Sequence, residues 1–258
     1  MSDGAVHLDI DAGLASVVFD RPSARNAMTW AMYAQLREIC ERLRTQPGVR
    51  VVCMRGAGHD AFVAGTDIEQ FREFRDGQAG VAYEARIDEG IAAIEALPMP
   101  TVAVIEGWAV GGGLAIATAC DIRIATPAAR FGVPIARTLG NCLSMANLAR
   151  LAAAFGRPRV QRMLIGAEIL TAEEALRCGY LAHLVDSEGI DAAAADLCRR
   201  LASLAPVTQA VTKEALSRLL IQGLPDGRDL IERSYGSADF REGVSAFCDK
   251  RSPSWQGR

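Results

Sequence analysis

Three consecutive glycines, Gly111 to Gly113, directly precede a run of small residues that predicts a helix, Leu114 to Ala119. The first N–H groups of a helix have no intrahelical partner, and glycine carries no side chain that would screen them. The positive end of this helix can therefore bind an anion, or an oxygen that gains negative charge during a reaction. Close packing of a small-residue helix requires the same glycines, so both interpretations stay open at this point.

A second glycine-rich segment, residues 56–61, follows an apolar run and fits the G-x-G-x-x-A pattern of dinucleotide-binding turns. The apolar run comes after a predicted hairpin and helix rather than opening a strand–helix–strand unit. Residues 62–65 are also a poor start for the required helix. The segment favours a connecting loop over a nicotinamide site.

The elements that must position these loops alternate between strand and helix up to about residue 140. Beyond that point helices dominate, with a capping box at Thr171 to Glu174 and an alanine-rich helix over residues 190–204. The patterns predict a hairpin over residues 6–10 and 14–19, further strands over 49–54, 102–105 and 122–125, and helices over 31–46, 81–97 and 114–119, with a charged helix after residue 66.

The composition is that of a packed globular chain. Of the 258 residues, 50% are hydrophobic and 23% are charged, which excludes disordered, collagen-like and coiled-coil classes. The formal net charge is −3 and the pI is about 5.7, so the basic surface that nucleic acids require is missing. We expect small molecules or further copies of the chain as partners.

The seven cysteines are scattered singly, without a CxxC pair or a histidine-rich companion segment. This pattern excludes a disulfide scaffold and a zinc ribbon, and we expect no metal. The amino terminus lacks the basic and apolar regions of a signal peptide, and no run reaches the roughly 18 apolar residues of a membrane span. We expect a cytoplasmic protein without a membrane partner.

Several motifs together resemble the crotonase family, also called the enoyl-CoA hydratase/isomerase family. The segment from Val102 to Ile122, which contains the triple glycine, resembles the family's signature. Further matches follow in family order over nearly the whole chain, at Arg21 to Ala27, Ala61 to Ile68, Phe131 to Pro134, Leu170 to Ala175 and Arg241 to Phe247.

The resemblance implies an α/β fold, a spiral of ββα turns over residues 1–205, followed by a helical trimerisation region over residues 206–258. It also implies a homotrimer or a dimer of trimers. The expected ligand is an acyl-CoA thioester, with no cofactor beyond the CoA that the substrate carries.

The same resemblance implies that the backbone N–H groups of Thr66 and Gly112 bind the thioester oxygen as it becomes an enolate. Thr66 stands where the family commonly has alanine, which leaves the backbone donor in place. The residues expected along the CoA path are Arg25, Ala64, Asp67 and Ile68, with Phe247 and Lys250 reaching the nucleotide of a neighbouring subunit. A solvated loop charge is the alternative for Arg25.

The chain differs from the family's hydratases at the two positions whose carboxylates carry out hydration. Hydratases of the family carry one glutamate two residues past the triple glycine and a second after Phe-Gly-x-Pro. Ala115 stands at the first position, and Ile135 or Ala136 at the second. Some isomerases place a carboxylate where this chain has Ser144. None of these side chains is a general acid or base, so we expect no efficient hydration.

Cys142 stands where the similar chlorobenzoyl-CoA dehalogenases have a nucleophilic aspartate. A thiol there could attack an acyl carbon if a helix start or Arg137 lowered its pKa, whereas a small buried hydrophobe is the alternative. Arg137 could clamp a second substrate carboxylate, or be exposed or ion-paired.

Two carboxylate pairs at helical spacing could supply a displaced base. They are Glu69 with Glu73, and Glu84 with Asp88. Solvated helix faces are the alternative for both pairs. The sequence therefore predicts an acyl-CoA enzyme that stabilises a thioester enolate and leaves its proton-transfer group open. A catalytically silent acyl-CoA-binding protein, or thiol chemistry at Cys142, remain as alternatives.

Overall fold

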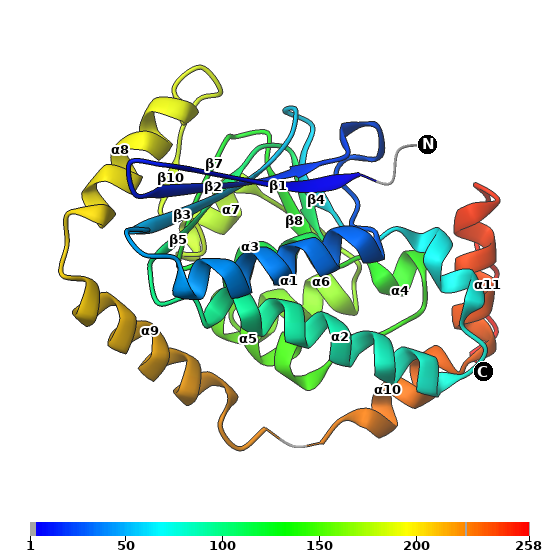
Figure 1. Ribbon diagram of the computed structural model, residues 1–258. Helices are drawn as coiled ribbons and strands as arrows, with labels where there is room; N and C mark the ends of the chain where they lie inside the picture. The colour runs from blue at the N-terminus through cyan, green and yellow to red at the C-terminus, as the bar shows by residue number, and fades with distance from the viewer. Residues whose placement is uncertain (1–3, 225, 258) are drawn as a thin grey trace.

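The computed structural model describes residues 4–224 and 226–257 (Figure 1). Its strands form two sheets. The six-stranded sheet has the order β1 (Ala5–Asp11), β2 (Leu14–Asp20), β3 (Val51–Gly56), β5 (Thr101–Ile105), β7 (Ile122–Ala125) and β10 (His183–Leu184). The four-stranded sheet has the order β4 (Ala61–Ala64), β6 (Trp108–Val110), β8 (Arg130–Gly132) and β9 (Ile169–Thr171).

The chain winds as a spiral, and each turn gives one strand to each sheet before a helix follows. β3 and β4 precede α2 (Gly77–Glu95), β5 and β6 precede α3 (Gly112–Ala119), and β7 and β8 precede α4 (Ile135–Thr138). Because successive turns repeat the same path, β3, β5 and β7 pair in parallel, and so do β4, β6 and β8. The expected spiral of ββα turns is confirmed.

Helices cover both faces of the six-stranded sheet. α1 (Trp30–Thr45) and α2 lie side by side over one face, and α8 (Ile190–Ala202) packs against the other (Figure 1). β5 is buried at every position because both of its faces are covered. The remaining helices are α5 (Met145–Phe155), α6 (Arg157–Leu164), α7 (Ala172–Arg177), α9 (Pro206–Ile221), α10 (Arg228–Tyr235), α11 (Ala238–Cys248) and the two short 3₁₀ helices η1 (Pro22–Ala24) and η2 (Ile68–Glu73).

Most elements predicted from the sequence are confirmed, one differs in type, and five short strands were not predicted. The hairpin forms, and the Thr171 side chain caps α7 by accepting from the Glu174 N–H. β4, β6, β8, β9 and β10 were not predicted, because strands of two to four residues carry too little periodicity. The charged helix expected after residue 66 is a 3₁₀ helix, η2 (Ile68–Glu73).

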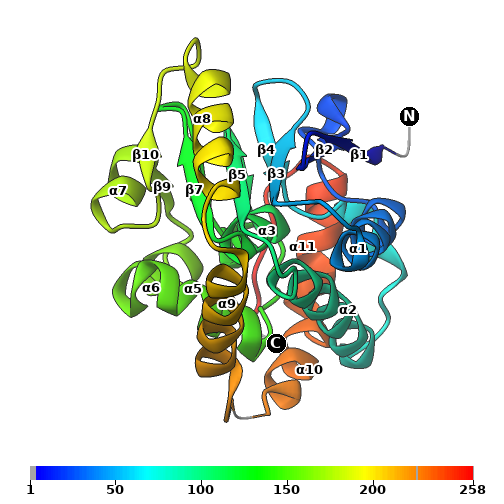
Figure 2. The same cartoon turned by 60° about the vertical axis from the view of Figure 1, so that its left-hand side comes forward.

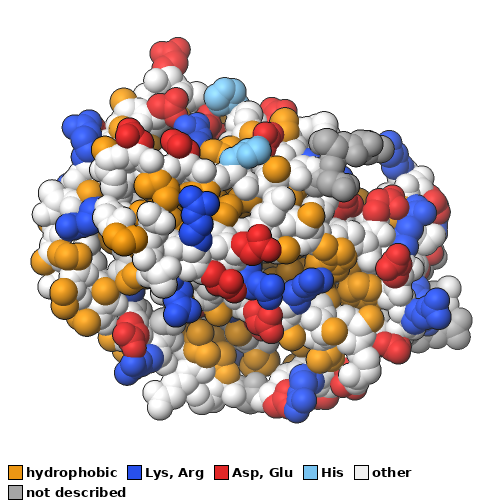
Figure 3. Space-filling model, viewed as in Figure 1, with side chains coloured by type: hydrophobic (Ala, Val, Ile, Leu, Met, Phe, Trp, Pro, Cys, Tyr) orange, Lys and Arg blue, Asp and Glu red, His pale blue; other side chains and the backbone are white. Residues whose placement is uncertain are grey.

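The last three helices differ in how they contact the core. α9 runs along the outside of the molecule, and none of its residues is buried within the described chain (Figures 1 and 2). Its exposed apolar side chains contribute to the hydrophobic surface at the lower left of Figure 3. α10 packs on α2, and α11 on η2 and α4. Their buried side chains Ile231, Tyr235, Phe240 and Val244 belong to the main core. No helix in the described ranges is long and apolar enough to cross a membrane.

Candidate active site

The edge where β4 and β6 end brings Thr66 and Gly112 onto adjacent segments. Ala64 pairs with Val110 in the parallel register, and Thr66 and Gly112 each lie two residues further on. Within residues 4–224 and 226–257, neither the Thr66 N–H nor the Gly112 N–H has a hydrogen-bond acceptor. Two unpaired donors on neighbouring segments, one of them at the start of α3, are suited to bind an oxygen that carries negative charge.

Each glycine of the triple has its own structural reason. Gly111 has a φ of 54°, in the left-handed region. A Cβ on Gly112 would lie 2.4 Å from the Tyr33 hydroxyl oxygen, and one on Gly113 would lie 1.9 Å from the carbonyl oxygen of Val63. Close packing therefore explains Gly113, while Gly112 keeps an unpaired N–H, so both interpretations of the motif apply.

The Thr66 side chain joins two tyrosines that the sequence analysis missed. Its Oγ1 lies 2.9 Å from the Tyr33 hydroxyl and 2.9 Å from the Tyr83 hydroxyl, and all three groups are buried. Burial raises the pKa of both tyrosines above the ordinary value, so both stay protonated. Nothing in the sequence distinguishes a tyrosine at this site from an ordinary core tyrosine on an amphipathic helix.

The structure brings three of the four residues expected on the CoA path close together. The Ala64 N–H donates to the carbonyl oxygen of Arg25, and the Arg25 side chain is exposed. Asp67 caps η2 and pairs with Arg21 at 2.8 Å. The buried side-chain amide of Asn26 holds this loop by donating to two carbonyl oxygens of residues 57 and 61.

The other expected binding residues lie on α11, just after it, or on elements that contact it. Ile68 opens η2 and is half-buried, and Arg137 is exposed on α4. Phe247, with 51% of its surface exposed, lies near the end of α11, and Lys250 follows that helix. Arg137, Phe247 and Lys250 are thus open to a ligand or another chain.

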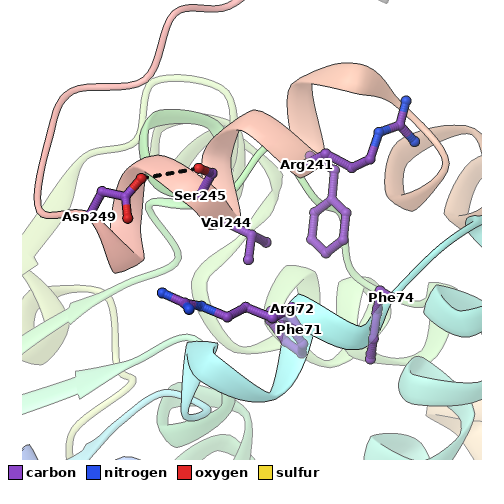
Figure 4. Close-up of a pocket in the computed structure, with 8 residues that line it drawn as sticks. Phe71, Arg72, Phe74, Arg241, Val244, Ser245 and Asp249 are labelled. Carbon is purple, nitrogen blue, oxygen red and sulfur yellow. Dashed lines mark hydrogen bonds between the residues drawn. The ribbon is translucent and has the colours of Figure 1, made fainter.

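A cavity of about 380 Å³ lies between η2 and α11 (Figure 4). Phe71, Phe74 and Val244 form its apolar lining, and the Arg72 side chain extends across it while Arg241 points away. Neither Thr66 nor Gly112 lines this cavity. Phe71, which lines the cavity, packs on Tyr83 with ring centroids 4.8 Å apart, and the Tyr83 hydroxyl lies 2.9 Å from the Thr66 Oγ1.

The positions where hydratases carry glutamates cannot transfer protons here. Ala115 is buried in α3, and Ile135 and Ala136 open α4. Ser144 caps α5 through its hydroxyl, which donates to Asp88.

Cys142 does not meet the condition for thiol chemistry. Burial raises the pKa of its thiol to about 11, and its hydrogen bond goes to the carbonyl oxygen of Leu230 at 3.7 Å. That shift is opposite to the one a nucleophilic thiolate needs. Among the described residues, no group of three His, Cys, Asp or Glu side chains could hold a metal ion.

Of the two carboxylate pairs, only the second reaches the interior. Glu69 and Glu73 are exposed, whereas Glu84 is 2% exposed. Its Oε1 accepts from the Tyr235 hydroxyl at 2.7 Å, and its Oε2 accepts from the Ser144 N–H at 2.9 Å. Desolvation raises the pKa of Glu84 to about 7, although both hydrogen bonds act in the opposite direction.

Comparison with known proteins adds independent findings. A family model described as "Enoyl-CoA hydratase/isomerase" matches residues 9–258. An (E)-benzylidenesuccinyl-CoA hydratase from Thauera aromatica is 33% identical over 98% of this chain and 99% of its own. An enoyl-CoA hydratase structure from Mycobacterium avium subsp. paratuberculosis superimposes with a TM-score of 0.82, at 30% identity over 97% of this chain and 98% of its own. A methylmalonyl-CoA decarboxylase complexed with 2S-carboxypropyl CoA gives a TM-score of 0.89, at 25% identity over 98% of both chains.

Proposed function

Since the chain belongs to the enoyl-CoA hydratase/isomerase family, we propose that it holds the carbonyl oxygen of an acyl-CoA thioester on the N–H groups of Thr66 and Gly112. The observation that carries this proposal is the β4/β6 register, which places two unpaired amides on adjacent segments. The named relatives support the ligand class, since their names or titles contain CoA thioesters or CoA analogues.

The chemistry follows from the charge that develops on the thioester oxygen. When a proton leaves the carbon next to the carbonyl, the electron pair moves toward oxygen and forms an enolate. Backbone N–H donors bind the enolate oxygen more strongly than the neutral carbonyl, and removing one such donor typically costs about 10²–10³ in rate. Because the donors are backbone groups, a threonine at residue 66 is compatible with this role.

The CoA portion would follow Arg25, Ala64, Asp67 and Ile68. Arg25 supports this assignment because it is an exposed cation beside the Ala64 segment. Arg137, exposed on α4, would meet a second carboxylate where the acyl group carries one.

We infer a homotrimer or a dimer of trimers, in which Phe247 and Lys250 reach the nucleotide of a neighbouring subunit. Their exposure at the end of α11 supports this role. The exposed apolar side chains of α9, among them Val207, Val211 and Leu219, supply a surface that another subunit would cover.

We expect little hydration, because neither Ala115 nor Ile135 can activate water. The test has two measurements on the same preparation. Calorimetry should show binding of acyl-CoA thioesters and no comparable heat with free acids, and crotonyl-CoA should be hydrated very slowly or not at all. Absence of heat with every acyl-CoA tried would refute the ligand class, and hydration at the rate of glutamate-bearing relatives would refute the assignment of the missing carboxylates.

A catalytically silent acyl-CoA-binding protein is the second candidate, favoured by the loss of carboxylates at residues 115, 135 and 144. It predicts affinity for thioesters without turnover of straight-chain, branched, aromatic or dicarboxylic acyl groups. Mass spectrometry of such a panel, incubated in heavy water, separates the two candidates, because an enolate-forming enzyme exchanges the α-proton even without net reaction.

A further inference from the structure

Glu84 is a buried carboxylate without a cation. No Lys or Arg among the described residues forms an ion pair with it, whereas Asp88 and Glu95 on the same helix both pair with Arg150. An unpaired charge inside a protein is costly, and the desolvation is not offset by its two hydrogen bonds, since the pKa remains raised. Buried carboxylates of this kind are concentrated at sites that transfer protons.

The surroundings of Glu84 connect it to the Thr66 site. Tyr83, the preceding residue of α2, places its hydroxyl 2.9 Å from the Thr66 Oγ1. The Tyr83 and Tyr235 rings have centroids 5.9 Å apart, and the Tyr235 hydroxyl donates to Glu84. The negative charge of Glu84 also raises the pKa of Tyr33 at the same site. Contacts through Tyr83 and Tyr235 thus link the Thr66 hydroxyl to the Glu84 carboxylate.

Glu84 also lies against the segment in which relatives of this family would carry an acidic side chain. Its Oε2 accepts from the backbone N–H of Ser144. Asn141 donates to the Tyr235 hydroxyl, and its own Oδ1 is buried without a hydrogen-bond partner in the described part of the chain. A carboxylate from α2 thus lies against residues 142–144, and a buried polar atom without a partner lies on the neighbouring side chain of Asn141.

We propose that Glu84 is the catalytic base and acid of an allylic proton shift in an enoyl-CoA substrate. This step rests on the proposed function, because the enolate oxygen is held by Thr66 and Gly112. The Glu84 carboxylate removes a proton from the carbon next to the thioester carbonyl, and the electron pair of that C–H bond forms the enolate. Glu84 then returns the same proton to the γ-carbon, the double bond moves into conjugation, and no water or other reactant is consumed.

The pH dependence of the proton-shift rate should follow the ionisation of Glu84. The charges of the groups around Glu84 also influence this ionisation. The groups that face Glu84, or pair with a group that does, are Tyr33 from α1, Tyr83 and Asp88 from α2, Cys142 before α5, Arg150 from α5, and Arg233 and Tyr235 from α10. The pKa values of the tyrosines and of the Cys142 thiol are all raised, which keeps these groups neutral near pH 7. The rate should therefore rise with pH as Glu84 ionises.

The test follows conversion of vinylacetyl-CoA to crotonyl-CoA, together with α-proton exchange in heavy water. Glu84→Gln should lower kcat by about 10²–10⁴-fold while the affinity for acyl-CoA, measured by calorimetry, stays nearly unchanged. Glu89→Gln is the control, since it removes an exposed carboxylate from the same helix and should leave kcat within about threefold. Glu84→Asp, which keeps the acid, should recover part of the activity.

Tyr235→Phe tests the role of Glu84 through the pH–rate profile, whose midpoint would not change if the role of Glu84 were purely structural. It removes a hydrogen bond that favours the ionised carboxylate, so the midpoint of the pH–rate profile should shift upward. Full activity of Glu84→Gln would overturn the proposal, as would an unchanged pH midpoint in Tyr235→Phe. Wild-type protein that binds acyl-CoA without isomerisation or exchange would also overturn it but leave the ligand class intact, whereas absence of binding would refute the proposed function itself.

Discussion

Gly113→Ala tests how closely the proposed oxyanion site depends on backbone packing. The new Cβ would lie 1.9 Å from the carbonyl oxygen of Val63 and 2.7 Å from its carbonyl carbon. Both are backbone atoms of β4, so no side-chain rotation can relieve the overlap. To reach an ordinary contact of 3.4 Å, α3 and β4 must separate by about 1.5 Å.

That separation acts on stability and on activity at once. Overpacking of a core by one methyl group costs about 1–3 kcal/mol, which lowers Tm by roughly 2–12 °C in a domain of this size. Because Gly112 begins α3 and Thr66 follows β4, the same movement displaces one N–H donor relative to the other. A displacement of about 1 Å can cost about 10²-fold in rate, so α-proton exchange should fall by that factor.

Gly90→Ala is the matched control for this substitution. Gly90 is buried in α2, and no heavy atom lies within 4 Å of where its Cβ would be. Alanine there should raise stability by about 0.5–1 kcal/mol, because glycine is unfavourable inside a helix, and should leave exchange unchanged. Thermal unfolding followed by circular dichroism and exchange followed by mass spectrometry provide both readouts. Gly113→Ala with the wild-type Tm and exchange rate would refute the reasoning, as would an equal loss in Gly90→Ala.

Three further predictions follow from the buried polar groups. Thr66→Ala should keep most of the exchange activity, since the backbone donor remains. It should lower the free energy of urea unfolding by about 1–3 kcal/mol, because the Tyr33 and Tyr83 hydroxyls lose their partner. An unchanged unfolding midpoint would contradict this prediction. Cys142→Ser should leave activity within about threefold, and the wild-type thiol should react slowly with iodoacetamide at neutral pH because burial raises its pKa to about 11; rapid labelling would contradict this. The pKa of Glu84 is about 7 in the folded protein against an ordinary value of 4.5, so the folded state binds this proton more tightly than the unfolded chain does, and its stabilising contribution is lost as pH rises between these values. The wild-type protein should therefore lose about 1–3 kcal/mol more unfolding free energy than Glu84→Gln between about pH 5 and about pH 8. An identical pH dependence in wild type and variant would argue against the raised pKa of Glu84.

Strong periodicity and specific motifs made much of the fold predictable. The hairpin, β3, β5 and β7 follow from apolar runs bounded by turn residues, and α1 follows from helical spacing. β4 and β6 escaped prediction because their stability comes from pairing with each other and with β8, which lies far along the chain. Single-sequence patterns carry no information on such partners.

In the candidate site, too, some features were predictable from the sequence and others were not. The triple glycine and the segment around Thr66 carry the resemblance that predicts the two backbone donors, because a motif in which backbone supplies the chemistry is visible in residue order. The absence of glutamates at residues 115 and 135 was equally visible.

Which carboxylate could act as a base was not visible, because ionisation depends on desolvation and on partners from distant segments. Glu69, Glu73, Glu84 and Asp88 have the same spacing pattern in the sequence. Only the packing of α2 against Ser144 and Tyr235, residues 60 and 151 positions away, buries Glu84 and raises its pKa. Residue order thus establishes the family and predicts the oxyanion donors. The proposed choice of Glu84 among four acids follows from tertiary packing, because burial and hydrogen bonding by distant segments set the protonation state of a carboxylate.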